Sequence, residues 1–173
     1  MITLTFAFWL LVVIFAIIGM TRGWAKELLV TFSVVLSLFF IEVTSRYVPP
    51  IRSFFAPPND STEFWVQTVI ITVLVFFGYQ SPNIAKFANA SRFARERLAD
   101  SLLGLFLGAV NGFLIFGSIW YFMIESEYPF SRYITPPQPE PSILAYLPPV
   151  WLGIPTIYFA MAVAFLFVLV VFI

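Results

Sequence analysis

The sequence predicts an all-α, polytopic integral membrane protein with about five transmembrane helices and one basic helix at the membrane interface. Hydrophobic residues make up 61% of the chain and charged residues only 10%, whereas a soluble domain carries about 25% charged residues. The apolar residues also form continuous runs instead of alternating with polar ones. This pattern favours membrane helices over a β-barrel.

The stretch from Asp100 to Glu125 predicts the helix around which the others pack. The 24 residues between these two acids are uncharged, and a helix of that length covers about 36 Å, enough to cross a bilayer with some tilt. Small residues recur along one face of this helix, at Gly104, Gly108 and Gly112, with Ala109 beside them. Such a face lets another backbone approach closely. We therefore expect this helix to be the central one of a bundle; the alternative is that the small-residue face lines a substrate path.

Two polar residues belong to the same helix. Asn111 lies near its middle, where an amide without a hydrogen-bond partner would be unfavourable in hydrocarbon. Asp100 lies one turn before Gly104, and we expect it at the start of the helix, where the helix dipole favours a carboxylate.

The other apolar runs predict four further spans. The span at residues 64–79 is short, at about 24 Å. Its Gln67 is expected to contact another helix rather than a ligand, and Asp60 or Ser61 to cap its N-terminus. The spans are predicted at residues 3–20, 28–45, 64–79 and 154–173.

Charged residues near the helix ends allow two interpretations each. Arg22, Lys26 and Glu27 lie around a turn beside Trp24, which suits a headgroup boundary. They form either a salt-bridged helix start or a gate for lipid headgroups or ions. Glu42 lies near the end of the second span. It either reaches the interface or pairs with Arg46 four residues on, or it is a functional carboxylate within the membrane.

The sequence divides into three regions. Residues 1–125 form a four-span membrane domain, residues 126–150 a proline-rich extracytoplasmic loop, and residues 151–173 an additional C-terminal span. The proline-rich loop is expected to be an extended spacer, with a polyproline docking site as the alternative. Within the first region, residues 83–98 predict a basic amphipathic helix that anchors the topology at the membrane surface or, alternatively, docks a partner or nucleic acid.

Basic residues predict the orientation, because they accumulate in cytoplasmic loops. The first and third loops hold six of them, at Arg22, Lys26, Lys86, Arg92, Arg95 and Arg97, whereas the second and fourth hold Arg46, Arg52 and Arg132. The N-terminus is then expected outside and the C-terminus in the cytoplasm. If the last apolar segment is re-entrant, the C-terminus returns to the outside.

Two sequence blocks resemble the colicin V production (CvpA) family of bacterial inner-membrane proteins. The first is the turn between the first two spans, carried by Arg22, Gly23, Trp24, Lys26 and Glu27. The second opens the fourth span and is carried by Asp100, Leu103, Gly104, Gly108, Ala109 and Gly112. The resemblance covers about residues 3–125 and implies an envelope protein linked to colicin export, without an established chemistry. The proline-rich loop and the last span depart from the family pattern.

The residue inventory argues against several chemistries. The chain has no Cys and no His, which excludes disulfides, thiolate metal ligands and a Ser-His or Cys-His pair. We therefore expect no enzyme activity, no metal site and no cofactor, and a net charge of zero implies no nucleic-acid partner. The expected partners are membrane lipids and other membrane helices.

Three functional hypotheses remain. The first is an accessory protein that acts by helix packing and assembly in export or envelope processes. The second is a structural subunit of a larger respiratory or photosynthetic membrane complex, which the 22 Phe residues and the added span suit. The third is a small channel or transporter that uses Asp100, Asn111 or Glu42.

Overall fold

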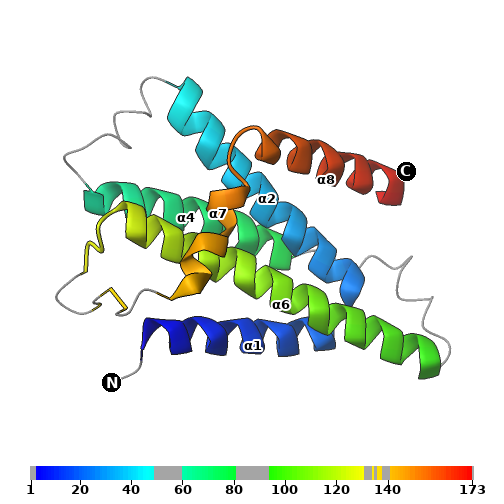
Figure 1. Ribbon diagram of the computed structural model, residues 1–173. Helices are drawn as coiled ribbons and strands as arrows, with labels where there is room; N and C mark the ends of the chain where they lie inside the picture. Colours follow the sequence, from blue (N-terminus) through cyan, green and yellow to red (C-terminus); the bar gives the residue numbers. More distant parts are fainter. Residues whose placement is uncertain are drawn as a thin grey trace.

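The computed structural model describes residues 3–48, 60–80, 94–130, 134, 136–137 and 141–172, and its regular elements there are helical (Figure 1). Four helices are long and apolar enough to cross a membrane: α1 (Leu4–Arg22), α2 (Trp24–Tyr47), α4 (Asp60–Tyr79) and α6 (Ala94–Glu125). The chain is therefore a polytopic helical membrane protein, as its composition predicts.

Helix α6 is the centre of the bundle. It packs against α1 along one side, and against α2 and α4 on the other. The buried core between α2, α4 and α6 includes Val34, Ile71, Leu114 and Ile115. The prediction that this helix faces protein is confirmed, and α1 is the neighbour that meets its glycines.

The helix boundaries differ from the predicted spans in two informative places. Helix α4 begins at Asp60 and has 20 residues, or about 30 Å, so the predicted shortfall in its length disappears. Helix α6 begins at Ala94. The prediction that Asp100 starts this helix is therefore wrong, because the helix has already run for more than one turn before it. Most of the predicted basic surface helix, at residues 83–93, lies outside the described residues, and its last part, residues 94–98, belongs to α6.

The segment after the fourth helix folds back onto the bundle. It forms the 3₁₀ helix η1 (Ser142–Tyr146) and the short helix α7 (Pro148–Trp151). Leu147 and Pro148 are buried, and the Pro148 ring lies so close to Gly117 that a Cβ there would come within 2.7 Å of it. The expected extended spacer is thus wrong for residues 142–150, since these largely apolar residues gain more by packing on α6 than by staying in a loop.

The last helix, α8 (Thr156–Phe172), packs on α2 through the buried Ile157. Its 17 residues extend about 26 Å, slightly less than the ~30 Å of a bilayer core. Helix α8 is therefore shorter than each of the four helices long enough to cross a membrane, and the fifth span stays a prediction.

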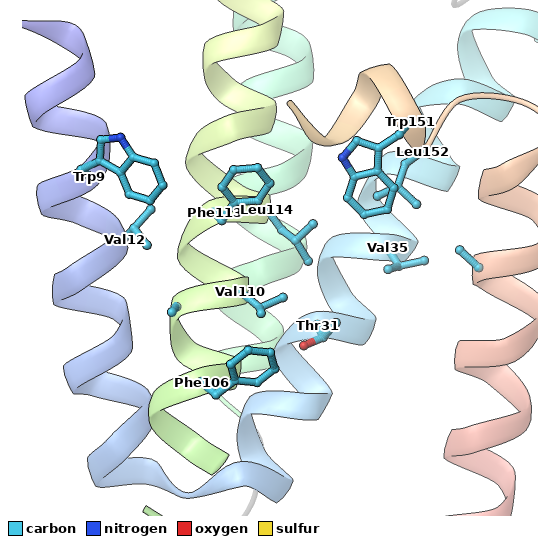
Figure 2. A pocket seen from close by; sticks show the side chains of 12 residues that line it. Trp9, Val12, Thr31, Val35, Phe106, Val110, Phe113, Leu114, Trp151 and Leu152 are labelled. Carbon is cyan, nitrogen blue, oxygen red and sulfur yellow. The ribbon is translucent and has the colours of Figure 1, made fainter. Parts of the chain in front are cut away.

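A groove of about 510 Å³ runs over one face of α6 (Figure 2). Val110 and Leu114 form part of its floor, and Ala109 also lines it. Trp9 of α1 lies on one side of it, and Trp151 lies on the other. Among the side chains that line this groove, only Thr31 is polar.

Candidate functional site

The small-residue face of α6 forms a direct backbone contact with α1. A Cβ placed on Gly104 would lie 2.4 Å from the Gly19 carbonyl oxygen, and one on Gly108 would lie 2.3 Å from the carbonyl oxygen of Phe15. One turn further on, Gly112 faces Val12 and Phe15. Only residues without a side chain permit this separation. The glycines therefore determine how closely the C-terminal part of α1 approaches α6.

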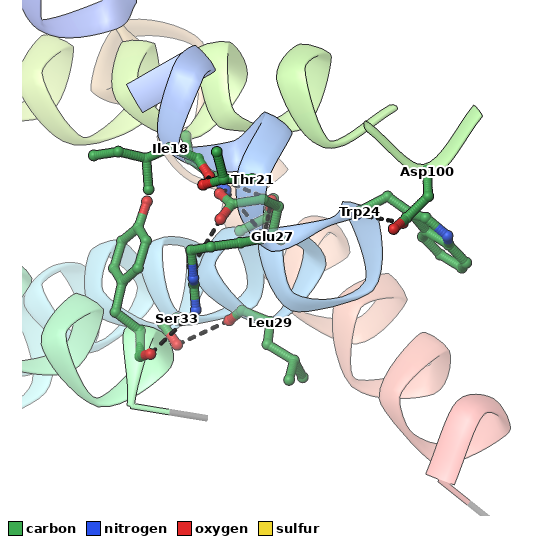
Figure 3. Close-up of polar contacts among 11 residues, drawn as sticks. Ile18, Thr21, Trp24, Glu27, Leu29, Ser33 and Asp100 are labelled. Carbon is green, nitrogen blue, oxygen red and sulfur yellow. Dashed lines mark hydrogen bonds and ion pairs between the residues drawn. The ribbon is translucent and has the colours of Figure 1, made fainter. Parts of the chain in front are cut away.

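This close approach places the corner between α1 and α2 on the side of α6. Gly23 forms the corner with φ of +85°, a backbone conformation that suits glycine. The Asp100 carboxylate of α6 accepts a hydrogen bond of 3.1 Å from the Trp24 backbone N–H, the first residue of α2 (Figure 3). Asp100 therefore caps α2 instead of its own helix, and its charge lies at the positive end of the α2 dipole.

A buried ion pair lies just inside the corner. The Arg22 guanidinium donates to a Glu27 carboxylate oxygen at 2.7 Å, and the Glu27 side chain is fully buried. Arg22 also donates to the Tyr79 backbone carbonyl at 3.1 Å, and its guanidinium carbon lies 4.3 Å from the centre of the Tyr79 ring. Arg22 thus connects the ends of α1, α2 and α4.

Asn111 completes the environment of Glu27 from the side of α6. Its amide nitrogen donates to the second carboxylate oxygen of Glu27 at 2.8 Å and to the Glu27 backbone carbonyl at 2.9 Å. The Thr31 hydroxyl lies 2.7 Å from the Asn111 side-chain oxygen, to which it can donate. The sequence predicts that the Asn111 amide needs a hydrogen-bond partner within the hydrocarbon. In the structure it forms three hydrogen bonds.

We refer to Arg22, Glu27, Thr31, Tyr79 and Asn111 as the polar corner. A buried charge is tolerated when it is paired and its remaining hydrogen-bonding sites are filled, and both carboxylate oxygens of Glu27 meet these conditions. The Tyr79 hydroxyl differs, because it is buried without a hydrogen-bond partner. Within the described ranges, no three acidic residues gather in a way that could hold a metal ion.

The structure brings some predicted residues together and separates others. The corner between α1 and α2 lies against the glycine face of α6. It brings together six of the predicted residues: Arg22, Gly23, Trp24, Glu27, Asp100 and Asn111. Lys26 is half-buried at the same corner, whereas Leu103 is exposed on the outer side of α6. Ala109 borders the groove.

Glu42 lies at the far end of α2 from the polar corner. Its side chain is half-buried, and among the described residues it forms no ion pair with Arg46. Gln67, expected to contact another helix, instead donates to Glu63 within α4 at 3.2 Å, and its own side-chain oxygen is buried without a partner.

Three contributors escaped the sequence reasoning. Gly19 ends the first apolar run, and its place opposite Gly104 becomes visible only when the two helices are paired. Thr31 carries a weak signal, since it is a hydroxyl four residues after Glu27 in an apolar run. Tyr79 contributes a backbone carbonyl and a ring face, and neither leaves a pattern in the sequence.

The fold and the polar corner define a class of protein, a multi-pass helical membrane protein with a glycine-mediated helix pair and an internal ion pair. The family model described as Colicin V production protein matches residues 4–135, about three quarters of the chain. This chain belongs to the colicin V production family, as the two sequence blocks indicate. No curated protein and no solved structure matches it.

Proposed function

We propose that this chain is a non-catalytic inner-membrane protein that acts by helix packing and assembly in export or envelope processes. One observation carries the proposal: the charged side chains of the polar corner direct their bonds inward, to other helices of the same chain. Bonds of this kind hold the bundle in one arrangement. The surfaces left for external contacts are then the apolar outer faces of the helices.

Those outer faces are extensive. On α1, the exposed side chains include Phe6, Val13 and Ile17, and on α6 they include Leu102 and Phe106. In a membrane, apolar exposure alone does not drive association, so partners must be recognised by shape and packing. A rigid bundle supports such recognition because it presents the same surface each time.

The glycine face of α6 is a poor candidate for this assembly surface. Gly104, Gly108 and Gly112 already contact α1 of the same chain. A bulky residue at Gly108 would disturb the monomer before any assembly, so it cannot test a partner interface. The assembly test therefore needs exposed positions.

Cysteine crosslinking offers that test, because the natural chain has no Cys. Single cysteines would replace Ile17, Leu102 and Val163, which are 56%, 65% and 68% exposed. Val30→Cys, at a position that is fully buried, is the matched control. Each chain would be oxidised in native membranes, and the crosslinked products would be identified by mass spectrometry.

We expect crosslinks at one exposed helix face and none at Val30→Cys. Products that contain a second copy would support homo-assembly, and products that contain export or envelope proteins would support an accessory role. A stoichiometric set of redox or pigment proteins would replace our proposal with that of a bioenergetic subunit. The absence of a crosslink at every exposed position, together with ion flux in liposomes, would favour a channel.

A further inference from the structure

The groove over α6 has the position and form of a binding site for one lipid chain. Its floor residues Val110 and Leu114 lie within the transmembrane part of α6, and Thr31 and Val35 come from within α2. The medium beside the groove is therefore hydrocarbon instead of water. We propose that the groove holds one acyl chain of a bilayer phospholipid as a specific, retained ligand.

The groove is about as long as the hydrocarbon depth of one leaflet, and on α6 it lies around the middle of the spanning segment Arg97–Glu125. On α6 its lining extends from Phe106 to Leu114, a rise of eight residue steps or about 12 Å. Half of a ~30 Å hydrocarbon core is about 15 Å. Figure 2 shows Phe106 and Thr31 at one end, towards the α1–α2 corner, and Trp9 and Trp151 at the other. The groove thus follows the helix axes, the direction in which acyl chains also extend.

The sides of the groove distinguish it from an ordinary lipid-facing helix surface. Trp9 and Trp151 are 47% and 49% exposed, and they stand on opposite sides of Phe113 on α6 (Figure 2). Leu152 extends the wall on the side of Trp151 (Figure 2), and Ala160 of α8 also lines the groove. A chain that lies on the floor beside either wall contacts protein on more than one side, whereas a chain on an outer helix face contacts it on one. Dispersion contacts increase accordingly.

The chemistry of the lining excludes a polar headgroup from the groove itself. Thr31 is the one polar side chain there, and its hydroxyl is already within hydrogen-bonding distance of Asn111 and of the Glu27 carbonyl. A second copy of the chain is also a poor occupant. Twelve residues line the groove, whereas a stable interface uses about 20–30 residues on each side.

The test compares two matched alanines on α8. Ala160 lines the groove, whereas Ala162 is exposed outside it. Ala160→Phe fills the groove, and Ala162→Phe adds the same side chain to the outer face. The full-length protein would be placed in nanodiscs of phosphatidylethanolamine and phosphatidylglycerol that contain a phospholipid with a diazirine on its acyl chain. After irradiation, labelled peptides would be quantified by mass spectrometry.

We expect labelling to concentrate on the peptides that contain Phe113 and Trp151, and to fall at least fivefold in Ala160→Phe but not in Ala162→Phe. Native mass spectrometry after detergent washing should retain one phospholipid on the unmodified chain. Trp151→Ala, which removes a wall without adding bulk, should reduce that retention while circular dichroism confirms the fold.

Several results would overturn the proposal. Equal labelling of the groove and the outer face of α8 would mean ordinary annular lipid. A bound isoprenoid quinone in place of a phospholipid, or protection of the groove only in a dimer, would assign it to another occupant. Unchanged retention in both Ala160→Phe and Trp151→Ala would place the retained lipid elsewhere.

Discussion

The Asn111 amide on α6 donates to the Glu27 carboxylate on α2 at 2.8 Å, across 84 positions of sequence. This bond connects the two blocks that define the family resemblance, because Glu27 belongs to the first and Asn111 lies inside the second. The two blocks are therefore parts of one buried structure. The two blocks are far apart in the sequence because most of α2, the whole of α4 and the first part of α6 lie between them.

Removal of the Glu27 charge should destabilise the bundle strongly. Glu27→Gln leaves the Arg22 guanidinium without its partner in a buried site, and breaking such a pair is unfavourable by about 3–5 kcal/mol. The double variant Arg22→Met with Glu27→Leu should recover much of that loss, since no unpaired charge remains. The measurement is the free energy of unfolding in mixed detergent micelles. Equal losses in the single and double variants would show that the ion pair is not the cause.

Replacement of Asn111 tests the hydrogen bonds separately from the charge. Asn111→Leu removes two donated bonds to Glu27 and leaves an acceptor without its donor, so we expect a loss of about 1–3 kcal/mol. Asn111→Asp places a second carboxylate beside Glu27 and should lower stability further by like-charge repulsion. If Asn111→Asp proves at least as stable as the natural chain at neutral pH, the amide does not donate to Glu27.

The α1–α6 contact should tolerate no added methyl group at its centre. Gly108→Ala brings a Cβ to within 2.3 Å of the Phe15 carbonyl oxygen, so the helices must separate. Overpacking of this kind lowers stability by about 1–3 kcal/mol. Leu102→Ala, at a position that is 65% exposed, is the matched control and should have little effect. Crosslinking between α1 and α6 through introduced cysteines would report the separation directly.

Asp100 should behave as a cap of α2. Asp100→Ala removes the acceptor for the Trp24 N–H and should lower stability by about 0.5–2 kcal/mol. Asp100→Asn retains an acceptor and should lose only part of that amount. Gly23→Ala should be worse than either, because it combines a strained backbone conformation with a Cβ within 3 Å of both Asp100 carboxylate oxygens. Selective loss of ion flux in Asp100→Asn with unchanged stability would instead support a channel role.

The orientation is tested by labelling of introduced cysteines. Thr21 and Glu127 are exposed at opposite ends of the bundle, and the distribution of basic residues predicts that Thr21 faces the cytoplasm. A membrane-impermeant maleimide should therefore label Glu127→Cys in intact spheroplasts, and Thr21→Cys only after lysis. A reporter fused after Ile173 should give a cytoplasmic signal if the last segment spans the membrane, and an extracytoplasmic one if it is re-entrant.

The sequence predicts the helical membrane fold and the central position of α6. Both predictions need only the hydrophobic composition and the spacing of glycines within one helix, which can be read directly from the sequence. It also marks Glu27 and Asn111 separately, one as a salt-bridge partner and one as an amide in need of a bond. It does not predict that they meet, since that depends on how α1, α2 and α6 pair in space. The role of Asp100 is misassigned for the same reason: its carboxylate caps α2, which is distant in sequence, and only the packing brings the start of α2 beside it.

The contact between Glu27 of α2 and Asn111 of α6 also has a consequence for synthesis. At about 5–20 residues per second, the 84 positions that separate Glu27 from Asn111 take on the order of 4–17 s to translate. During that interval the corner already holds Arg22 and Glu27, but neither Asn111 nor the glycines of α6 have left the ribosome. A nascent chain at this stage carries an incompletely satisfied ion pair in or near the bilayer. The first hairpin therefore gains the Asn111 bonds to Glu27 only after the fourth long helix has been made.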